Sequence, residues 1–308
     1  MRKLVDLFNT PGFLLMHVAC LLIIWSGISR VALTTCVGLY VVRMIGITVG
    51  FHRYFSHRTY KTSRTFQLLL AVLGTTAAQQ GPLWWAAHHR DHHRFADTKN
   101  DPHSPSMQGF WWSHVGWILA PQNQKTNYKL VPDLIKFPEL RFLNKFYLLP
   151  PVLLAVSLYI LGTVLNRYSP SLGTSGFQLV VWGFFVSTVL LYHGTFSVNS
   201  LTHMFGRRRF QTNDDSRNSW LIAVITLGEG WHNNHHFCPS SERQGFRWWE
   251  IDVSHYVLQL LGWMRIVWEL RAPLESRNGA ALTATQMILH SNGLAPAVYP
   301  TTSGEEIG

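Results

Sequence analysis

A short stretch late in the sequence, residues 230–236, carries three histidines at positions i, i+3 and i+4. They are His232, His235 and His236. On a helix, residues three and four apart are neighbours on one face, so this spacing brings the imidazoles together. Neutral imidazoles that converge on one point suit a first-row transition metal such as iron, copper or zinc. The same spacing occurs far upstream, at His89, His92 and His93.

Two further pairs have side chains that could join a metal site. His52 and His57 lie five residues apart, which is about 140° on a regular helix. Both can bind one site only if the helix ends or bends between them. Asn199 and His203 lie four apart, on one helical face. The four clusters together hold nine histidines, more ligands than one ion takes, so two ions sharing the set is the expected arrangement.

Histidines outside the clusters need no metal to explain them. A lone histidine is more often a hydrogen-bonded core or surface residue, and this applies to His17, His114, His193, His255 and His290. His88 and His103 are expected to support the ligands or the local structure. Metal-bound imidazoles usually donate their other N–H to an oxygen. Five acidic residues are close enough in sequence to be candidates for that role, although an ordinary solvated acid is the commoner case: Asp91, Asp97, Asp101, Glu229 and Asp252.

The type of metal follows from the motifs that surround it. Zinc would suit hydrolysis, but no helical His-Glu-x-x-His with its base glutamate occurs. Two redox-active irons would instead activate dioxygen. Cys20, Cys36 and Cys238 have no regular spacing, which predicts neither a disulfide framework nor a thiolate metal site.

The bulk composition indicates a membrane protein. The chain has 308 residues, of which 47% are hydrophobic and only 14% charged, whereas soluble domains carry about 25% charged residues. Four apolar runs are close to the roughly 20 residues that cross a bilayer. They are residues 13–28, 31–50, 146–165 and 177–198. The net charge of +10 is not organised as a nucleic-acid motif and favours a membrane surface or a phosphate-bearing substrate.

The distribution of charge predicts the topology. Most Lys and Arg fall in the N-terminal segment, in residues 51–145 or after residue 198, whereas the two short hairpin loops contain only Arg30 and Arg167. By the positive-inside tendency, both termini and every histidine cluster lie in the cytoplasm. We therefore expect an all-α integral membrane protein with one domain, residues 1–272. Residues 51–145 and 199–272 would form a cytosolic helical cap, and residues 273–308 a disordered tail. Residues 248–270 suit either an interfacial helix or a helix packed on the cap.

The ordered motifs resemble those of membrane fatty acyl desaturases of the stearoyl-CoA desaturase type. The matching pieces are His52-Arg-Tyr-Phe-Ser-His57, His89-Arg-Asp-His92-His93, Asp101-Pro102-His103, Ser113-His114-Val115-Gly116-Trp117, Asn199-Ser-Leu-Thr-His203 and Gly228-Glu-Gly-Trp-His232-Asn-Asn-His235-His236. Each is weak alone, but their order between two helical hairpins is highly specific. The run Gly81-Pro82-Leu83-Trp84-Trp85 is similar to bacterial members, and His88 departs from the pattern.

The resemblance implies a fold of four transmembrane helices and a cytosolic cap that holds two iron ions. It implies iron ligation by the clustered histidines, with Asn199 acting through a water. The implied ligands are His52, His57, His89, His92, His93, His203, His232, His235 and His236. How they divide between the irons stays open.

The resemblance also implies the reaction, an O2-dependent insertion of a cis double bond, delta-9 by expectation, into a long saturated acyl chain. The chain would arrive as an acyl-CoA or on a lipid, and an external carrier of the cytochrome b5, ferredoxin or rubredoxin type would supply electrons. Basic residues Arg207, Arg208 and Arg209 could hold coenzyme A phosphates or attract anionic lipid. A histidine-box hydroxylase is the alternative enzyme, and a metal transporter the alternative class. The expected location is the lipid bilayer, the inner membrane if the source is bacterial.

Overall fold

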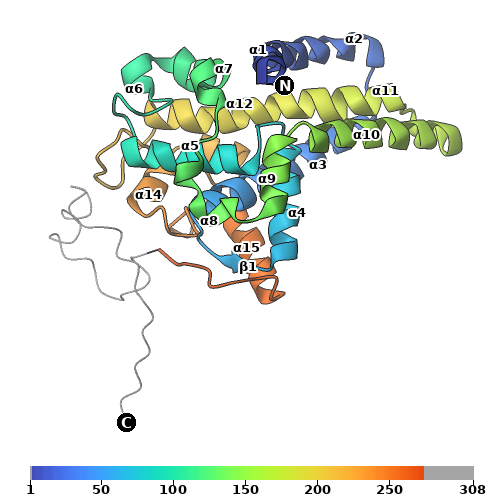
Figure 1. The fold of residues 1–308 in the computed structure, drawn as a ribbon. Helices are drawn as coiled ribbons and strands as arrows, with labels where there is room; N and C mark the ends of the chain where they lie inside the picture. The colour runs from blue at the N-terminus through green and yellow to red at the C-terminus, as the bar shows by residue number, and fades with distance from the viewer. Residues whose placement is uncertain (1, 274–308) are drawn as a thin grey trace.

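The computed structural model describes residues 2–273 and, for side chains, residues 11–273. A bundle of long helices forms one part of the molecule, and a lobe of shorter helices forms the other (Figure 1). We call residues 57–148 and 204–272 the helical lobe. The expected tail, residues 273–308, lies outside the described residues except for Pro273.

Three helical runs are long and apolar enough to cross a membrane: Arg30–Ser56, Leu149–Tyr168 and Gly176–His203. The first comprises α3 (Arg30–Ile45) and the π-helix η2 (Gly46–Ser56), and the second is α10 (Leu149–Tyr168). The third comprises α11 (Gly176–Leu179), the π-helix η7 (Val180–Val186), α12 (Ser187–Ser200) and η8 (Leu201–His203). These runs confirm three of the predicted apolar helices, with ends displaced by one to six residues.

The N-terminal run consists of α1 (Arg2–Ala19), η1 (Cys20–Leu22) and α2 (Ile23–Ser26). Its apolar part, Pro11–Ser26, is shorter than the other three runs. The run packs against η7 and α12, and Figure 1 shows α2 above the helix that begins with α11. A fourth membrane span here therefore stays a prediction.

The helical lobe is assembled from short elements. Its first part contains β1 (Lys61–Thr62), α4 (Arg64–Thr75), α5 (Pro82–Phe95), α6 (Pro105–Gln108), η3 (Trp112–Gly116), α7 (Trp117–Leu119), η4 (Pro121–Gln124), η5 (Tyr128–Leu130), α8 (Pro132–Ile135) and α9 (Pro138–Lys145). Its second part contains α13 (Trp220–Ile225), α14 (His232–Phe237), α15 (Val253–Trp263) and β2 (Val267–Trp268). The η6 turn (Pro170–Leu172) closes the hairpin between α10 and α11. β1 and β2 pair antiparallel, which joins the two parts.

The core of the lobe lies around η2, because this helix runs out of the bundle into the lobe. Phe51 and Phe55 of η2 are fully buried, with Leu83 of α5 and Leu134 of α8 in the same apolar cluster. The Arg90 guanidinium of α5 donates to the Phe55 and Ser56 carbonyls at the end of η2, and it pairs with Asp133 of α8. η2 and α5, which carry four of the nine clustered histidines and have His57 directly after η2, are therefore fixed against each other.

Arg43 interrupts the apolar sequence of α3 but is almost fully buried. Its guanidinium donates to the hydroxyls of Ser187 and Thr188 on α12 and to the Thr76 carbonyl. A buried charge without hydrogen bonds would be costly, and these contacts remove that cost. They also connect α3 to α12. Arg43, which interrupts the apolar sequence, therefore serves to hold two helices together.

Candidate metal centre

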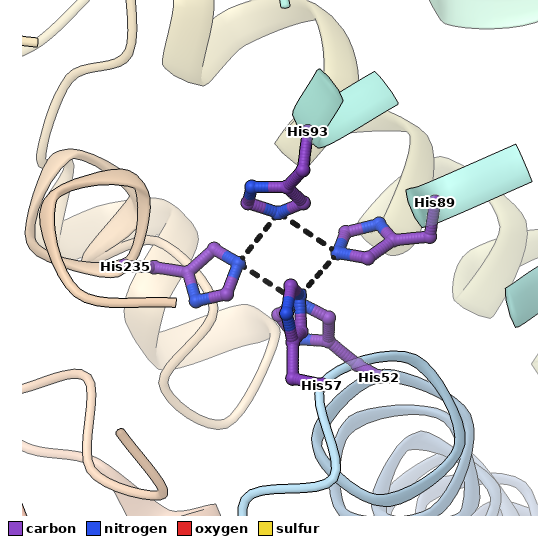
Figure 2. Close-up of side chains that lie close together, drawn as sticks. All are labelled: His52, His57, His89, His93 and His235. Carbon is purple, nitrogen blue, oxygen red and sulfur yellow. Dashed lines mark hydrogen bonds between the residues drawn. The ribbon is translucent and has the colours of Figure 1, made fainter. Parts of the chain in front are cut away.

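Five histidines from three separated segments form one group: His52, His57, His89, His93 and His235. Figure 2 shows their rings pointing toward a common centre, with Nε2 atoms facing each other. The Nε2–Nε2 separations are 2.7 Å for His57–His89, 3.1 Å for His89–His93, 2.9 Å for His93–His235 and 3.1 Å for His52–His235. The group joins η2, α5 and α14 at one point.

The π-helical form of η2 is what brings His52 and His57 together. Its hydrogen bonds run from residue i+5 to residue i, as from the His57 N–H to the His52 carbonyl at 3.2 Å. Five residues therefore make about one turn, and the two rings lie 4.9 Å apart. As expected, the helix ends between these residues, at Ser56, and its wider π-helical turn before that end lets both rings face one group.

Four histidines form a second group: His92, His203, His232 and His236. The Nε2 atoms of His203 and His232 are 3.0 Å apart, and those of His92 and His236 are 3.4 Å apart. A third, smaller set joins His92 to Asp101 and His103.

Each histidine triad is divided between the two groups. On α5, His89 and His93 face the five-histidine group and His92 faces the four-histidine group. On α14, His232 and His236 enter the four-histidine group and His235 enters the other. The three imidazoles of a triad therefore do not converge on one point as the spacing alone predicted, and α5 and α14 each bridge two adjacent sites.

Carboxylates fix the outer nitrogen of four of these rings. The Nδ1 atoms of His92, His203 and His236 lie 3.0, 2.7 and 2.8 Å from oxygens of Asp101, Asp97 and Asp214. His52 Nδ1 contacts Glu229 in the same way. Asp97, Asp101 and Glu229 are thus confirmed as hydrogen-bond partners of histidines in the two groups. Sequence reasoning missed Asp214, because it is 22 residues before its partner and follows no periodicity.

The remaining predicted support residues lie elsewhere. Asp252 pairs with Arg53 at 2.9 Å, and Arg53 in turn contacts Glu229, the partner of His52, so two residues stand between Asp252 and His52 on this path. Asp91 faces partly outward and is half-buried. His88 bonds to the Trp84 carbonyl at 2.9 Å, and His103 stacks on His92 with ring centroids 4.2 Å apart.

The surroundings keep the carboxylates ionised and five of the clustered imidazoles neutral, whereas the pKa of His92 is raised, because the effect of burial is outweighed by its contact with Asp101. Burial alone would raise the pKa of Asp97, but its hydrogen bond with His203 and that from the Asp215 N–H lower it to about 2. Contacts with their histidines hold the pKa of Asp101 and Asp214 still lower, against the effect of burial. Burial, followed by neighbouring histidines, lowers the pKa of His57, His89, His93, His232 and His235 well below 6.5.

The donor set fits two transition-metal ions. A neutral imidazole that donates Nδ1–H to an ionised carboxylate has a lone pair on Nε2. In the four-histidine group carboxylates face Nδ1 of His92, His203 and His236, so Nε2 is the atom of each ring available to a metal. Where both rings are neutral, the Nε2 lone pairs of His92 and His236 face each other at 3.4 Å. Without a cation between them, such an arrangement is repulsive. The buried Nδ1 atoms of His232 and His235 have no partner among the described residues, so these two rings are oriented by packing instead.

Asparagines place the helix α14 that carries three of the ligands. The Asn218 side-chain oxygen accepts from the Asn233 and Asn234 N–H groups, which satisfies the start of this short helix. Asn233 accepts in turn from the Arg209 and Phe210 N–H groups. The two asparagines within the motif His232-Asn-Asn-His235-His236 therefore anchor α14 to the lobe while its histidines face the metal groups.

A cavity of about 310 Å³ leads to the histidines. Its wall is mostly apolar, with Phe13, Trp117, Phe184 and Phe196 among its residues, and His89 and Asn199 lie at its inner end. A smaller cavity of about 40 Å³ continues from there. Its lining includes four histidines and one carboxylate, His52, His89, His92, His232 and Glu229, together with Met44, Ile47, Thr195, Val198 and Thr226 among others. Apolar space thus passes directly beside both histidine groups.

The sequence matches a known protein family over most of its length. The family model "Fatty acid desaturase" matches residues 28–267. The chain belongs to this family. The described histidine groups fit the metal centre that the resemblance implies, and desaturases are oxidoreductases of lipid metabolism.

Curated desaturases of several specificities are similar to this chain. The sn-1 stearoyl-lipid 9-desaturase of Anabaena variabilis is 38% identical over 83% of this chain and 90% of its own length. The palmitoyl-monogalactosyldiacylglycerol delta-7 desaturase of Arabidopsis thaliana is 37% identical over 89% and 71%. The acyl-CoA C20 Delta5-desaturase of Anemone leveillei is 36% identical over 84% and 80%. The family therefore includes different acyl carriers and different double-bond positions.

The arginines predicted to meet substrate phosphates lie away from both cavities of this desaturase. The Arg207 main chain pairs with Asn218, and its side chain is exposed. The Arg208 guanidinium donates to the Thr212 and Asp214 carbonyls, and that of Arg209 lies 3.4 Å from Glu250. None of the three lines either cavity. Phosphate binding by these residues stays a prediction.

Proposed function

We propose that this desaturase uses O2 to insert one cis double bond into a long saturated acyl chain, at two irons held by the nine histidines. The observation that carries the proposal is a pair of mostly apolar cavities that share four lining residues, Trp85, His89, Thr195 and Asn199. They pass His89, Asn199 and His52 and have histidines of both groups on their walls. An extended acyl chain is the substrate whose shape and polarity fit such a space.

Two iron ions would supply the oxygen activation needed to remove hydrogen from an unactivated methylene. The five-histidine group would hold one, and the four-histidine group the other. Asn199 lines both cavities beside His89, which suits an amide that reaches the second iron through a water. In balance, O2, two electrons and two protons give two waters as two hydrogens leave the chain, so an external electron carrier is required.

The position of the double bond would be set where the two cavities join. Thr195 lines both, and its hydroxyl accepts from the Gln79 amide at 2.8 Å. Trp85 also lines both and stacks on His89 at 5.0 Å between ring centroids. These fixed side chains define which methylene lies beside the histidines. Delta-9 insertion is the expectation, and the sn-1 stearoyl-lipid 9-desaturase among the relatives supports it.

The deciding experiment is fatty acid analysis of a host that expresses the protein. Gas chromatography–mass spectrometry of derivatised fatty acids should show a new monounsaturated species and give its double-bond position. The His235→Ala variant should yield none and should retain less iron, because it removes one ligand of the five-histidine group. His255→Ala, whose ring contacts Glu242 instead, is the matched control. A hydroxylated product would instead identify a hydroxylase.

A further inference from the structure

The larger cavity is closed at one end and open at the other. At the inner end its residues are buried, as shown by Trp117 at 6% exposure and Phe196 at 4%. At the other end, Leu15 is 65% exposed, Leu148 51% and Val152 55%, although all three line the same cavity. Residues that line a cavity and are also exposed mark its mouth. The mouth therefore lies between α1 and the start of α10.

This mouth opens on the apolar surface of the helix bundle. Val152 is 16 residues before Tyr168, the far end of α10. At 1.5 Å per residue it lies roughly 24 Å along the helix, inside a hydrocarbon layer of about 30 Å and near its lobe side. The neighbouring outer residues Leu153 and Val156 are likewise exposed and apolar. In a bilayer, lipid chains would contact this opening directly.

The α1 side of the mouth is held by aromatic and imidazole contacts with α12. Phe13 stacks on Tyr192 with ring centroids 5.8 Å apart, and Nε2 of His17 lies 3.1 Å from Nε2 of His193. α1 thus stands away from α10 at a defined position. Gly12 and Met16 complete the α1 part of the cavity wall. The opening is a built feature of the helix packing.

The charge of the cavity argues against a phosphate-rich carrier inside it. Among the described residues that line it, none is Lys, Arg, Asp or Glu. The phosphates of coenzyme A require cationic partners. Of the three arginines predicted for that purpose, Arg208 and Arg209 have partners within the lobe, and Arg207 is exposed and lines neither cavity. A neutral ester at the membrane interface needs no such partners.

We propose that the substrate is a saturated chain esterified to a membrane glycerolipid, which enters sideways from the bilayer between α1 and α10. The glycerol and headgroup stay at the interface, and the chain passes the mouth and reaches the histidines. The inference rests on the proposed desaturase function. It adds the acyl carrier and the route of entry.

The carrier is tested with the full-length, iron-loaded protein in lipid nanodiscs. One arm contains phosphatidylcholine with a deuterated stearoyl chain at sn-1, and the other two supply deuterated stearoyl-CoA or stearoyl-acyl carrier protein with the same reductant and O2. We expect the deuterated double bond on intact phosphatidylcholine. Conversion of a soluble ester while the lipid stays saturated overturns the inference. Conversion of none of the three contradicts the proposed function itself.

The route is tested by variants on α10. Val152→Trp and Leu148→Trp place a large side chain in the mouth and should lower the rate of lipid conversion at least about tenfold. Ile160→Trp is the matched control, since Ile160 is 56% exposed on the same helix but does not line the cavity. Iron content, measured by metal analysis, should not change in any of them. Equal rates in all three variants would refute entry at this mouth.

A photoreactive lipid gives a readout that needs no turnover. Phosphatidylcholine with a mid-chain diazirine, irradiated with the iron-loaded protein in nanodiscs without reductant, should label peptides that contain Trp117 or Phe196. Val152→Trp should abolish that labelling, whereas Ile160→Trp should preserve it. Labelling confined to the outer surfaces of α10 and α1 would exclude entry of the chain.

Discussion

At the scale of single residues, the metal centre depends on which nitrogen of each imidazole is hydrogen-bonded to a carboxylate and which is available to a metal. Asp97, Asp101, Asp214 and Glu229 each accept from one Nδ1 and so leave Nε2 free for a metal. Three of these carboxylates serve the four-histidine group, whereas only Glu229 serves the five-histidine group. The four-histidine site therefore has the larger local negative charge, which would favour retention of a cation there.

Asp214→Asn tests the contribution of the carboxylate that sequence reasoning missed. An amide at this position cannot act as an anionic acceptor for His236 Nδ1–H, so the basicity of the ring falls. We expect iron affinity at the four-histidine group to fall about 10- to 100-fold, with half of the total iron lost on dialysis. Metal analysis after dialysis against a chelator measures it. Asp91→Asn, close to the same histidines but with no histidine contact among the described residues, should keep both irons.

The iron-free protein should lose stability in mild acid. Burial lowers the pKa of His57, His89 and His235 well below 6.5, so these rings stay neutral in the folded state. The unfolded chain takes up their protons near pH 6.5, so stability falls as the pH drops below that value, by up to about 1.4 kcal/mol per histidine and pH unit. The midpoint of thermal unfolding should fall between pH 7.5 and pH 5.5. A midpoint that changes only below pH 4 would assign the effect to the carboxylates instead.

The sequence predicted which histidines gather together better than it predicted how they divide into two groups. All nine clustered histidines lie in the two groups, because local spacing and number already indicated metal binding. Their division between the groups was not readable, since it depends on how α5 and α14 approach each other in the fold. Asp214 shows the same limit, as it reaches His236 across a loop that has no periodic pattern.

At the scale of elements, the π-helix η2 determines the geometry of the first pair. A regular helix would separate His52 and His57 by about 140°, and only the wider turn lets both face one group. Close packing accompanies it: a Cβ added to Gly46 would lie 2.8 Å from the Gly74 nitrogen, and one added to Gly74 would lie 2.4 Å from the Phe51 ring. Because both positions are glycine, α4 can pack directly against η2.

Gly46→Ala should therefore disturb the metal centre from a distance. The new methyl group meets backbone atoms of α4, which cannot move aside without shifting η2. We expect a loss of about 1–3 kcal/mol in the free energy of unfolding and reduced iron retention at the five-histidine group. Chemical unfolding monitored by Trp fluorescence, together with metal analysis, measures both.

Gly38→Ala is the internal control for this prediction. Gly38 belongs to the same helical run, but no atom outside its own helix lies within 4 Å of an added methyl group there. Alanine is the better helix former, so this variant should be unchanged or more stable by about 0.5–1 kcal/mol. If both variants lost iron equally, packing of α4 on η2 would not be the cause.

The long helices were predictable from the sequence, because the length of an apolar run is enough to identify them. The three confirmed runs needed only about 20 apolar residues each to be recognised. The π-helical segments within them were not predictable, because their extra residue per turn is stabilised by tertiary contacts such as those of Gly46. The role of Arg43 was likewise not predictable, because its hydrogen-bond partners Ser187 and Thr188 lie on another helix, far away in the sequence.

At the scale of the whole molecule, the position of the lobe relative to a membrane depends on the number of spans. If the runs Arg30–Ser56, Leu149–Tyr168 and Gly176–His203 cross a bilayer, both parts of the lobe lie on one side of it, because two crossings separate them. The N-terminal run determines only the location of the N-terminus. If Pro11–Ser26 and the residues before it cross the bilayer, the N-terminus lies on the same side as the lobe.

An impermeant thiol reagent distinguishes these topologies. In a variant whose three cysteines are replaced by Ala, Ser171→Cys, in the hairpin loop after α10, should be labelled from outside intact cells. Asn100→Cys, exposed in the lobe, should be labelled only after lysis, as a cytoplasmic metal centre requires. A cysteine tag placed before Met1 should behave like Asn100→Cys if the N-terminal run is a fourth span. Labelling of that tag from outside, together with protection of Asn100→Cys, would establish three spans and would place α1 as a helix packed against the bundle without crossing.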